Sequence, residues 1–101
     1  MDTLYKQPSE SRRYFVRFHK FPEIEEGAVI SAISEVDYTV EEGTETTALS
    51  LSDESPGENG QSAVFRIAGG THDVLYKVTA KVTTDQGDTL EGGGYLWVYD
   101  F

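Results

Sequence analysis

Residues 63–98 constrain the fold of this chain most, because apolar and polar side chains alternate there with a period of two. In residues 75–83 the apolar side chains of one parity are Tyr76, Val78, Ala80 and Val82. The opposite parity carries Lys77, Thr79 and Lys81, as in a strand with one buried and one solvated face. Residues 63–67 and 95–99 also alternate, and turns that contain glycine separate the three segments. The pattern predicts three consecutive strands.

Three further segments, residues 14–18, 28–40 and 46–51, also predict strands. In the longest of them one parity holds Ile30, Ala32, Ser34, Val36, Tyr38 and Val40. A helical stripe through Ile33, Val36 and Val40 is the alternative, but the β-branched residues and the lack of a capping box favour a strand. Residues 53–61 contain a proline and an Asn-Gly pair, which predict a surface loop.

Turn signals recur about every 8 to 15 residues, a spacing typical of an all-β sandwich of about six or seven strands. We expect residues 14–101 to form one domain and no segment to form a helix. Residues 1–13 are polar and without periodicity, so they predict a flexible N-terminal arm. The run Gly92-Gly93-Gly94 predicts a bulge or kink before the last strand. The predicted core consists of apolar residues from five segments: Val16, Phe18, Ile30, Val36, Phe65, Ile67, Tyr76, Val78, Val82, Leu96 and Val98.

Composition excludes several classes of partner and site. The 18 acidic and 8 basic residues give a formal charge of −10, which opposes phosphate backbones and anionic membrane surfaces, so we expect no nucleic-acid partner. The lack of cysteine excludes a disulfide framework and a cysteine metal site. We find neither a secretory signal nor an apolar run of the ~20 residues that a membrane span needs, so we expect synthesis in the cytoplasm and no membrane span.

Catalytic motifs are hard to find in this chain. The only histidines are His19 and His72, and the Asp73 neighbour of His72 would face the other way in a strand. Acidic residues of 53–61 have the atoms that calcium prefers but not the alternating spacing of a calcium loop. The glycine runs at 69–70 and 92–94 have no following helix or lysine that would make a phosphate loop. We therefore predict no enzyme, no metal site and no cofactor.

The last predicted strand carries large aromatic residues on one face: Tyr95, Trp97 and Tyr99. They could pack under a loop or a neighbouring strand. They could also form a partner-binding stripe, because aromatic residues are enriched among interface anchors. We treat them as the candidate interface residues.

Several strings in the second half resemble short immunoglobulin-like structural proteins of tailed phages and prophages, a group that includes fiber-tail adaptor and tail-associated proteins. The similar segments are residues 64–71 (VFRIAGGT), 76–79 (YKVT), 82–88 (VTTDQGD) and 96–98 (LWV), and the first half is similar more loosely from Tyr14 onward. This resemblance implies an immunoglobulin-like β-sandwich of antiparallel strands without a disulfide. The outward face of the last strand, often charged in this group, is aromatic here, which favours a contact surface.

The resemblance further implies a non-enzymatic virion protein that acts in head-tail or tail-fiber assembly and is assembled in the bacterial cytoplasm. Its partners would be other virion proteins and copies of itself. The alternative is a bacterial immunoglobulin-like binding module that recognises a carbohydrate or a surface protein.

Overall fold

The protein is described here from a computed structural model, which describes residues 3–100. These residues form seven strands: β1 (Thr3–Lys6), β2 (Arg12–Arg17), β3 (Ile30–Glu42), β4 (Leu49–Pro56), β5 (Ser62–Gly69), β6 (Val74–Thr84) and β7 (Thr89–Val98). Two helical turns complete the described part, α1 (Pro22–Glu25) and the 3₁₀ turn η1 (Glu58–Gly60). The predicted all-β class is confirmed, whereas the prediction of no helix is wrong for these two short turns.

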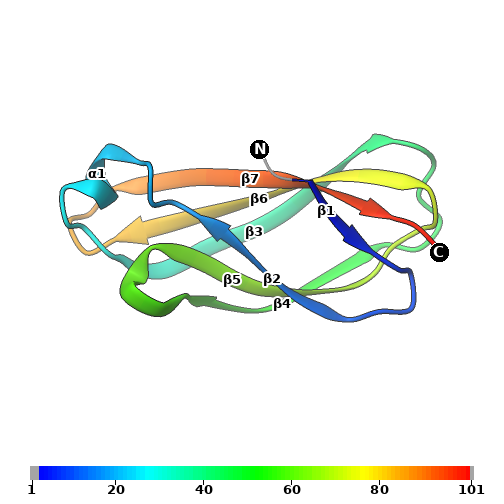
Figure 1. Ribbon diagram of the computed structural model, residues 1–101, viewed down its shortest axis with the longest axis horizontal. Helices are drawn as coiled ribbons and strands as arrows, with labels where there is room; N and C mark the ends of the chain where they lie inside the picture. Colours follow the sequence, from blue (N-terminus) through cyan, green and yellow to red (C-terminus); the bar gives the residue numbers. More distant parts are fainter. Residues whose placement is uncertain (1–2, 101) are drawn as a thin grey trace.

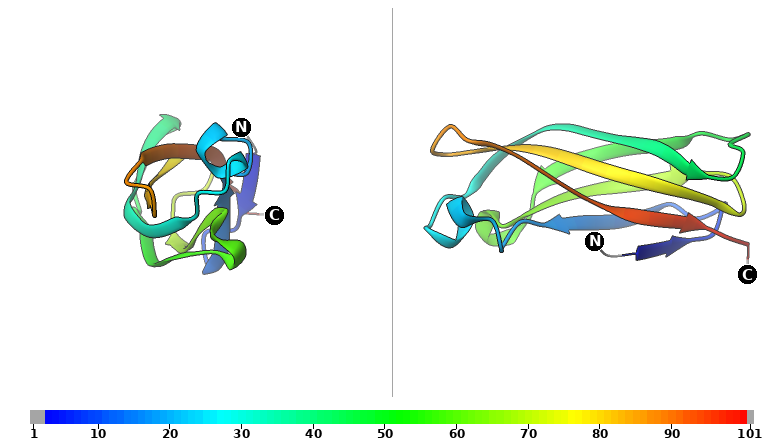
Figure 2. Two further views of the ribbon diagram at one scale, coloured as in Figure 1. Left: turned by 90° about the vertical axis from the view of Figure 1, so that its left-hand side faces the viewer. Right: turned by 90° about the horizontal axis from the view of Figure 1, so that it is seen from above.

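The strands form two sheets that pack face to face in an elongated body of 41 × 21 × 19 Å (Figures 1 and 2). One sheet has the order β1-β7-β6-β3 and the other the order β2-β5-β4. Apart from β1, the strand order matches that of an immunoglobulin domain, in which the second, fifth and fourth strands form one sheet and the third, sixth and seventh form the other. The predicted all-β sandwich of seven strands in two sheets is therefore confirmed, with one difference from the predicted antiparallel arrangement: β1 pairs with β7 in parallel.

The core lies between the two sheets, and every residue predicted for it belongs to it. Val16 and Val36 are its partly buried members; the other predicted residues are buried. Further buried members that the prediction left out are Tyr14, Ile24, Leu49, Ala63, Val74, Ala80 and Leu90. Ile24 enters the core because α1, which starts at Pro22, turns it inward.

The long strand β3 does not keep the predicted alternation. Its register against β6 shifts between Ile30 and Ala32 and again between Ile33 and Glu35. Each shift inserts a residue and changes which parity faces the core. As a result Ile33 packs against the core while Ala32 is exposed. Val40 keeps the parity of Val36 and Tyr38 but is 40% exposed, next to a third shift before Glu42. These irregularities produced the helix-like spacing seen in the sequence.

The predicted flexible arm over residues 1–13 is wrong for its described part, because β1 extends the sheet and β2 starts at Arg12. Lys6, the last residue of β1, holds this segment in place, and its side chain is fully buried. Its ammonium donates hydrogen bonds to the carbonyls of Gln7 (2.7 Å), Pro8 (3.3 Å) and Gly69 (2.5 Å). Residues 1 and 2 lie outside the described residues.

Two smaller predictions are also corrected. Strand β4 starts later than predicted and continues to Pro56, past an irregularity at Asp53, where φ is 56°, so half of the predicted loop 53–61 is strand. The triple glycine causes no bulge, because the pairing of β6 with β7 runs without a register shift from Val74 to Thr83.

A buried tyrosine supports the corner between β5 and β6. Tyr76 is fully buried, and its hydroxyl accepts a hydrogen bond of 3.0 Å from the backbone N–H of Thr71. A tyrosine near the start of the sixth strand that bonds back to the chain a few residues upstream is typical of immunoglobulin domains. Burial also raises the pKa of Tyr76, so the hydroxyl stays protonated at neutral pH.

We expect Tyr76→Phe to lower the free energy of unfolding by about 1–3 kcal/mol, because the Thr71 N–H would lose its partner. Urea unfolding monitored by tryptophan fluorescence measures this change. Tyr95→Phe is the matched control, because the Tyr95 hydroxyl has no hydrogen-bond partner among residues 3–100. Equal stabilities of the two variants would contradict the role of the corner.

We expect Lys6→Met to lower the free energy of unfolding by about 1–3 kcal/mol, because three carbonyls would lose their donor inside the protein. Burial lowers the pKa of the Lys6 ammonium, and the nearby Glu10 carboxylate acts in the opposite direction. Lys77→Met, on the outer face of β6, removes the same charge without this loss. A Lys6→Met protein as stable as Lys77→Met would show that these bonds do not hold β1.

Candidate protein–protein interface

The outer face of the β1-β7-β6-β3 sheet carries a row of large side chains. Trp97 of β7 lies opposite Tyr5 of β1 on one side and Leu75 of β6 on the other. Two residues before Trp97 on β7, Tyr95 lies opposite Lys77 of β6. Tyr5 is 54% exposed, while Trp97, Tyr95 and Leu75 are partly exposed. We call this surface the aromatic patch; it comprises Tyr5, Leu75, Tyr95, Trp97 and Tyr99.

Tyr99 extends the aromatic patch beyond the end of β7. Its ring is 43% exposed and lies 4.7 Å, centroid to centroid, from the ring of His72. Its backbone N–H donates a 2.9 Å hydrogen bond to the Lys6 carbonyl, and His72 Nδ1 accepts one of 2.9 Å from the Asp100 N–H. The structure thus brings the three predicted residues onto one outer surface. The sequence argument missed Tyr5, because it reaches this surface only through the parallel pairing of β1 with β7, near the other end of the chain. It also missed Leu75, although the alternation in residues 75–83 already placed Leu75 on the outward face.

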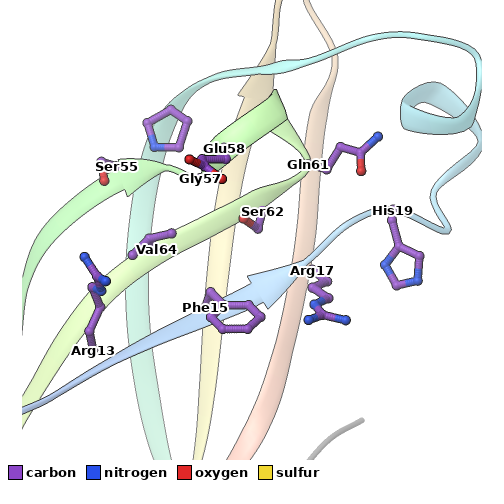
Figure 3. A pocket seen from close by; sticks show the side chains of 11 residues that line it. Arg13, Phe15, Arg17, His19, Ser55, Gly57, Glu58, Gln61, Ser62 and Val64 are labelled. Atoms are coloured by element: carbon purple, nitrogen blue, oxygen red, sulfur yellow. The ribbon is translucent and has the colours of Figure 1, made fainter.

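The opposite outer face, on the β2-β5-β4 sheet, holds an open groove of about 750 Å³ (Figure 3). Arg13, Phe15 and Arg17 project from β2 along one side, and Val64 of β5 lies in its floor. Residues 55–58 form the other wall. Phe15 is 52% exposed, and the Arg17 guanidinium lies 5.1 Å from the centre of its ring, within cation–π distance.

This groove is basic on a chain of net charge −10, because Arg13 and Arg17 line it with one acidic residue, Glu58. Arg66 on the same face forms an ion pair with Asp53 at 3.7 Å. By contrast, no carboxylate of residues 3–100 lies within ion-pair distance of Arg13 or Arg17. Two arginines and an exposed phenylalanine therefore face solvent together. Alternation of basic and aromatic residues at 13, 15 and 17 was the sequence signal, and the prediction of a flexible arm over residues 1–13 left Arg13 out of it.

The structure does not gather the histidines into a catalytic arrangement. His19 lines the basic groove, whereas His72 lies at the end of the aromatic patch, and the two occupy different faces. In the part of the chain that the structure describes, no three side chains of His, Cys, Asp or Glu converge on a metal-sized site, and this includes the acidic residues of 53–61. No helix among the described residues is long and apolar enough to cross a bilayer.

The described residues thus form a small β-sandwich with two distinct exposed faces, one aromatic and one basic. The family model of the podophage GP4 fiber-tail adaptor protein gp77 matches residues 6–95. The chain therefore belongs to this phage fiber-tail adaptor family, and the resemblance seen in the sequence is confirmed. No curated protein and no solved structure matches the chain significantly.

Proposed function

We propose that this protein is a structural component of a phage or prophage virion that attaches tail fibers to the tail through protein–protein contacts. The observation that carries the proposal is the match to a fiber-tail adaptor family over residues 6–95, nearly the whole described chain. The fold supports the proposal, because a rigid sandwich can bind one partner on each of its two outer faces. We further propose that the protein acts without catalysis and is assembled into particles in the bacterial cytoplasm.

The aromatic patch is the proposed main contact surface. Interfaces are enriched in tyrosine and tryptophan because these side chains bury a large apolar area and keep a polar group at the edge. Trp97 lies in the middle of the row, flanked by Tyr5 and Leu75, the position in which binding energy is usually concentrated. The partner would be another virion protein or a further copy of this chain.

The basic groove is the proposed second contact, on the opposite face of the sandwich. Arg13 and Arg17 suit a partner surface that carries carboxylates, because such pairing steers association and selects orientation. In a virion each contact recurs by symmetry, so contacts that are weak singly add up to a firm joint.

The test is a phage that lacks this gene, complemented from a plasmid. We expect electron microscopy to show particles with tails but without attached fibers, and adsorption to host cells to be lost. The wild-type gene should restore both. Particles that keep their fibers and adsorb normally without the protein would contradict the proposal.

A further inference from the structure

The sandwich is open along one side, between β2 and β7. β2 is the outer strand of its sheet and pairs only with β5. On the other sheet β1 covers β7 only from Tyr95 to Val98, so residues 89–94 of β7 have no described strand on that side. We call this opening the β2–β7 seam.

A slot of about 330 Å³ leads from the seam to the core. Its apolar lining comes from four strands and includes Val16, Phe65, Ile67, Val78 and Leu96. At its rim lie Arg17, His19 and Lys20, all exposed. Val16 and Leu4, which also line the slot, are only partly buried although they pack against the core.

The triple glycine lies beside the slot: Gly93 and Gly94 line it without a side chain, whereas at Gly92 the chain packs closely against Phe18 and Val16. Gly92 has the inward parity of Leu90 and Leu96, and a Cβ placed on it would lie 3.0 Å from the Phe18 ring and 3.3 Å from Val16. Since the pairing of β7 is regular here, these glycines serve no bulge or turn. The close neighbours of these glycines are the Phe18 ring at Gly92 and the Val78 carbonyl of β6 at Gly93.

We propose that the β2–β7 seam receives an extended segment of a partner virion protein, which pairs with the free edge of β2 and places side chains in the slot. This inference rests on the proposed function and names its mode of binding. Unpaired strand edges accept such a strand through main-chain hydrogen bonds, and pockets for alternate side chains give specificity.

The chemistry of the seam defines the partner segment. Because side chains alternate along a strand, every second one would enter the apolar slot and the others would face the rim. Arg17 and Lys20 select acidic residues at the rim positions, since neither has a carboxylate partner among residues 3–100. The segment is therefore a strand of alternating apolar and acidic residues.

The experiment uses the full-length, ¹⁵N-labelled protein and a capped octapeptide of alternating valine and glutamate. We expect the peptide to shift the amide signals of Val16, Gly93 and Gly94 in NMR spectra and to slow hydrogen exchange along β2. A peptide of alternating valine and lysine should bind at least ten-fold more weakly. Arg17→Glu combined with Lys20→Glu should weaken binding of the glutamate peptide at least ten-fold as well.

The matched control is Lys77→Glu combined with Lys81→Glu, which changes charge equally on the outer face of the other sheet and should leave binding unchanged. Absence of binding at millimolar peptide, equal loss in the control, or shifts confined to the aromatic patch would overturn the inference. Self-association of the protein that Arg17→Glu with Lys20→Glu abolishes would assign the seam to a second copy and also overturn it. The peptide titration and the gene deletion test separate claims. If the deletion removes the fibers but the peptide does not bind, only this inference is contradicted. If the deletion leaves the fibers intact, the proposed function is contradicted.

Discussion

Replacing Trp97 with alanine is expected to weaken the attachment of this protein to its virion partner about 30-fold or more. Trp97 occupies the centre of the aromatic patch between Tyr5 and Leu75. Removal of a central aromatic anchor typically costs at least about 2 kcal/mol of binding free energy, and about 1.4 kcal/mol corresponds to a ten-fold change. The measurement is the fraction of particles with fibers when the variant gene complements the deletion.

Trp97 is partly buried, so the variant's thermal unfolding must be compared with that of the wild type. Tyr5→Ser provides an independent test, because Tyr5 is 54% exposed and its loss should change stability little while reducing fiber attachment. Thr79→Ala, on the outer face of the same sheet away from the aromatic patch, is the control and should attach normally. Full complementation by both Trp97→Ala and Tyr5→Ser would show that the aromatic patch is not the contact surface.

The largest effect on stability is expected for Phe18→Ala, which should lower the free energy of unfolding by about 3–5 kcal/mol. Phe18 is fully buried; its ring lies 5.1 Å, centroid to centroid, from the tilted ring of Phe21 and faces Gly92 of β7. Its loss leaves a cavity where the two sheets and the start of α1 meet. Since small domains are stable by only about 5–15 kcal/mol, the variant should be near unfolding at 37 °C.

Phe15→Ala is the matched control, because it removes the same side chain three residues earlier from the solvent side of β2. Phe15 is 52% exposed, so we expect a loss below about 1 kcal/mol. Thermal and urea unfolding measure both variants. Equal losses for Phe15→Ala and Phe18→Ala would mean that the chain does not form the two-layered core described here.

The strands that sequence analysis predicted best are those whose environment is uniform along their length. β6 has a paired strand on each side, and every second residue from Val74 to Thr84 is buried, so its alternation is visible directly. In β3 the register against β6 shifts at three places, and the first two shifts change the buried parity along the strand. Such irregularities cannot be located from alternation alone.

β1 was missed because its inward positions include a lysine. A buried ammonium is stable at Lys6 only because carbonyls of Gln7, Pro8 and the distant Gly69 accept its hydrogen bonds. The last of these is 63 residues away in sequence, so no local pattern could reveal it. For the same reason Tyr5, and with it part of the aromatic patch, became apparent only in three dimensions.

The candidate interface was half visible in the sequence. Tyr95 and Trp97 could be placed on one face from the period of β7 alone, whereas the composition of the rest depends on which strands lie beside it. The basic groove likewise requires β2 and β5 to pair, which brings Arg13 beside Arg66. That these surfaces bind virion proteins stays a prediction.

The most direct test of the account is a cryo-electron microscopy reconstruction of the intact tail, together with mass spectrometry of purified particles. We predict that the protein is present in the particles and that its 41 × 21 × 19 Å sandwich fits density at the joint between tail and fiber, with the Trp97 face buried against a neighbour. Particles with attached fibers that do not contain this chain would contradict the account.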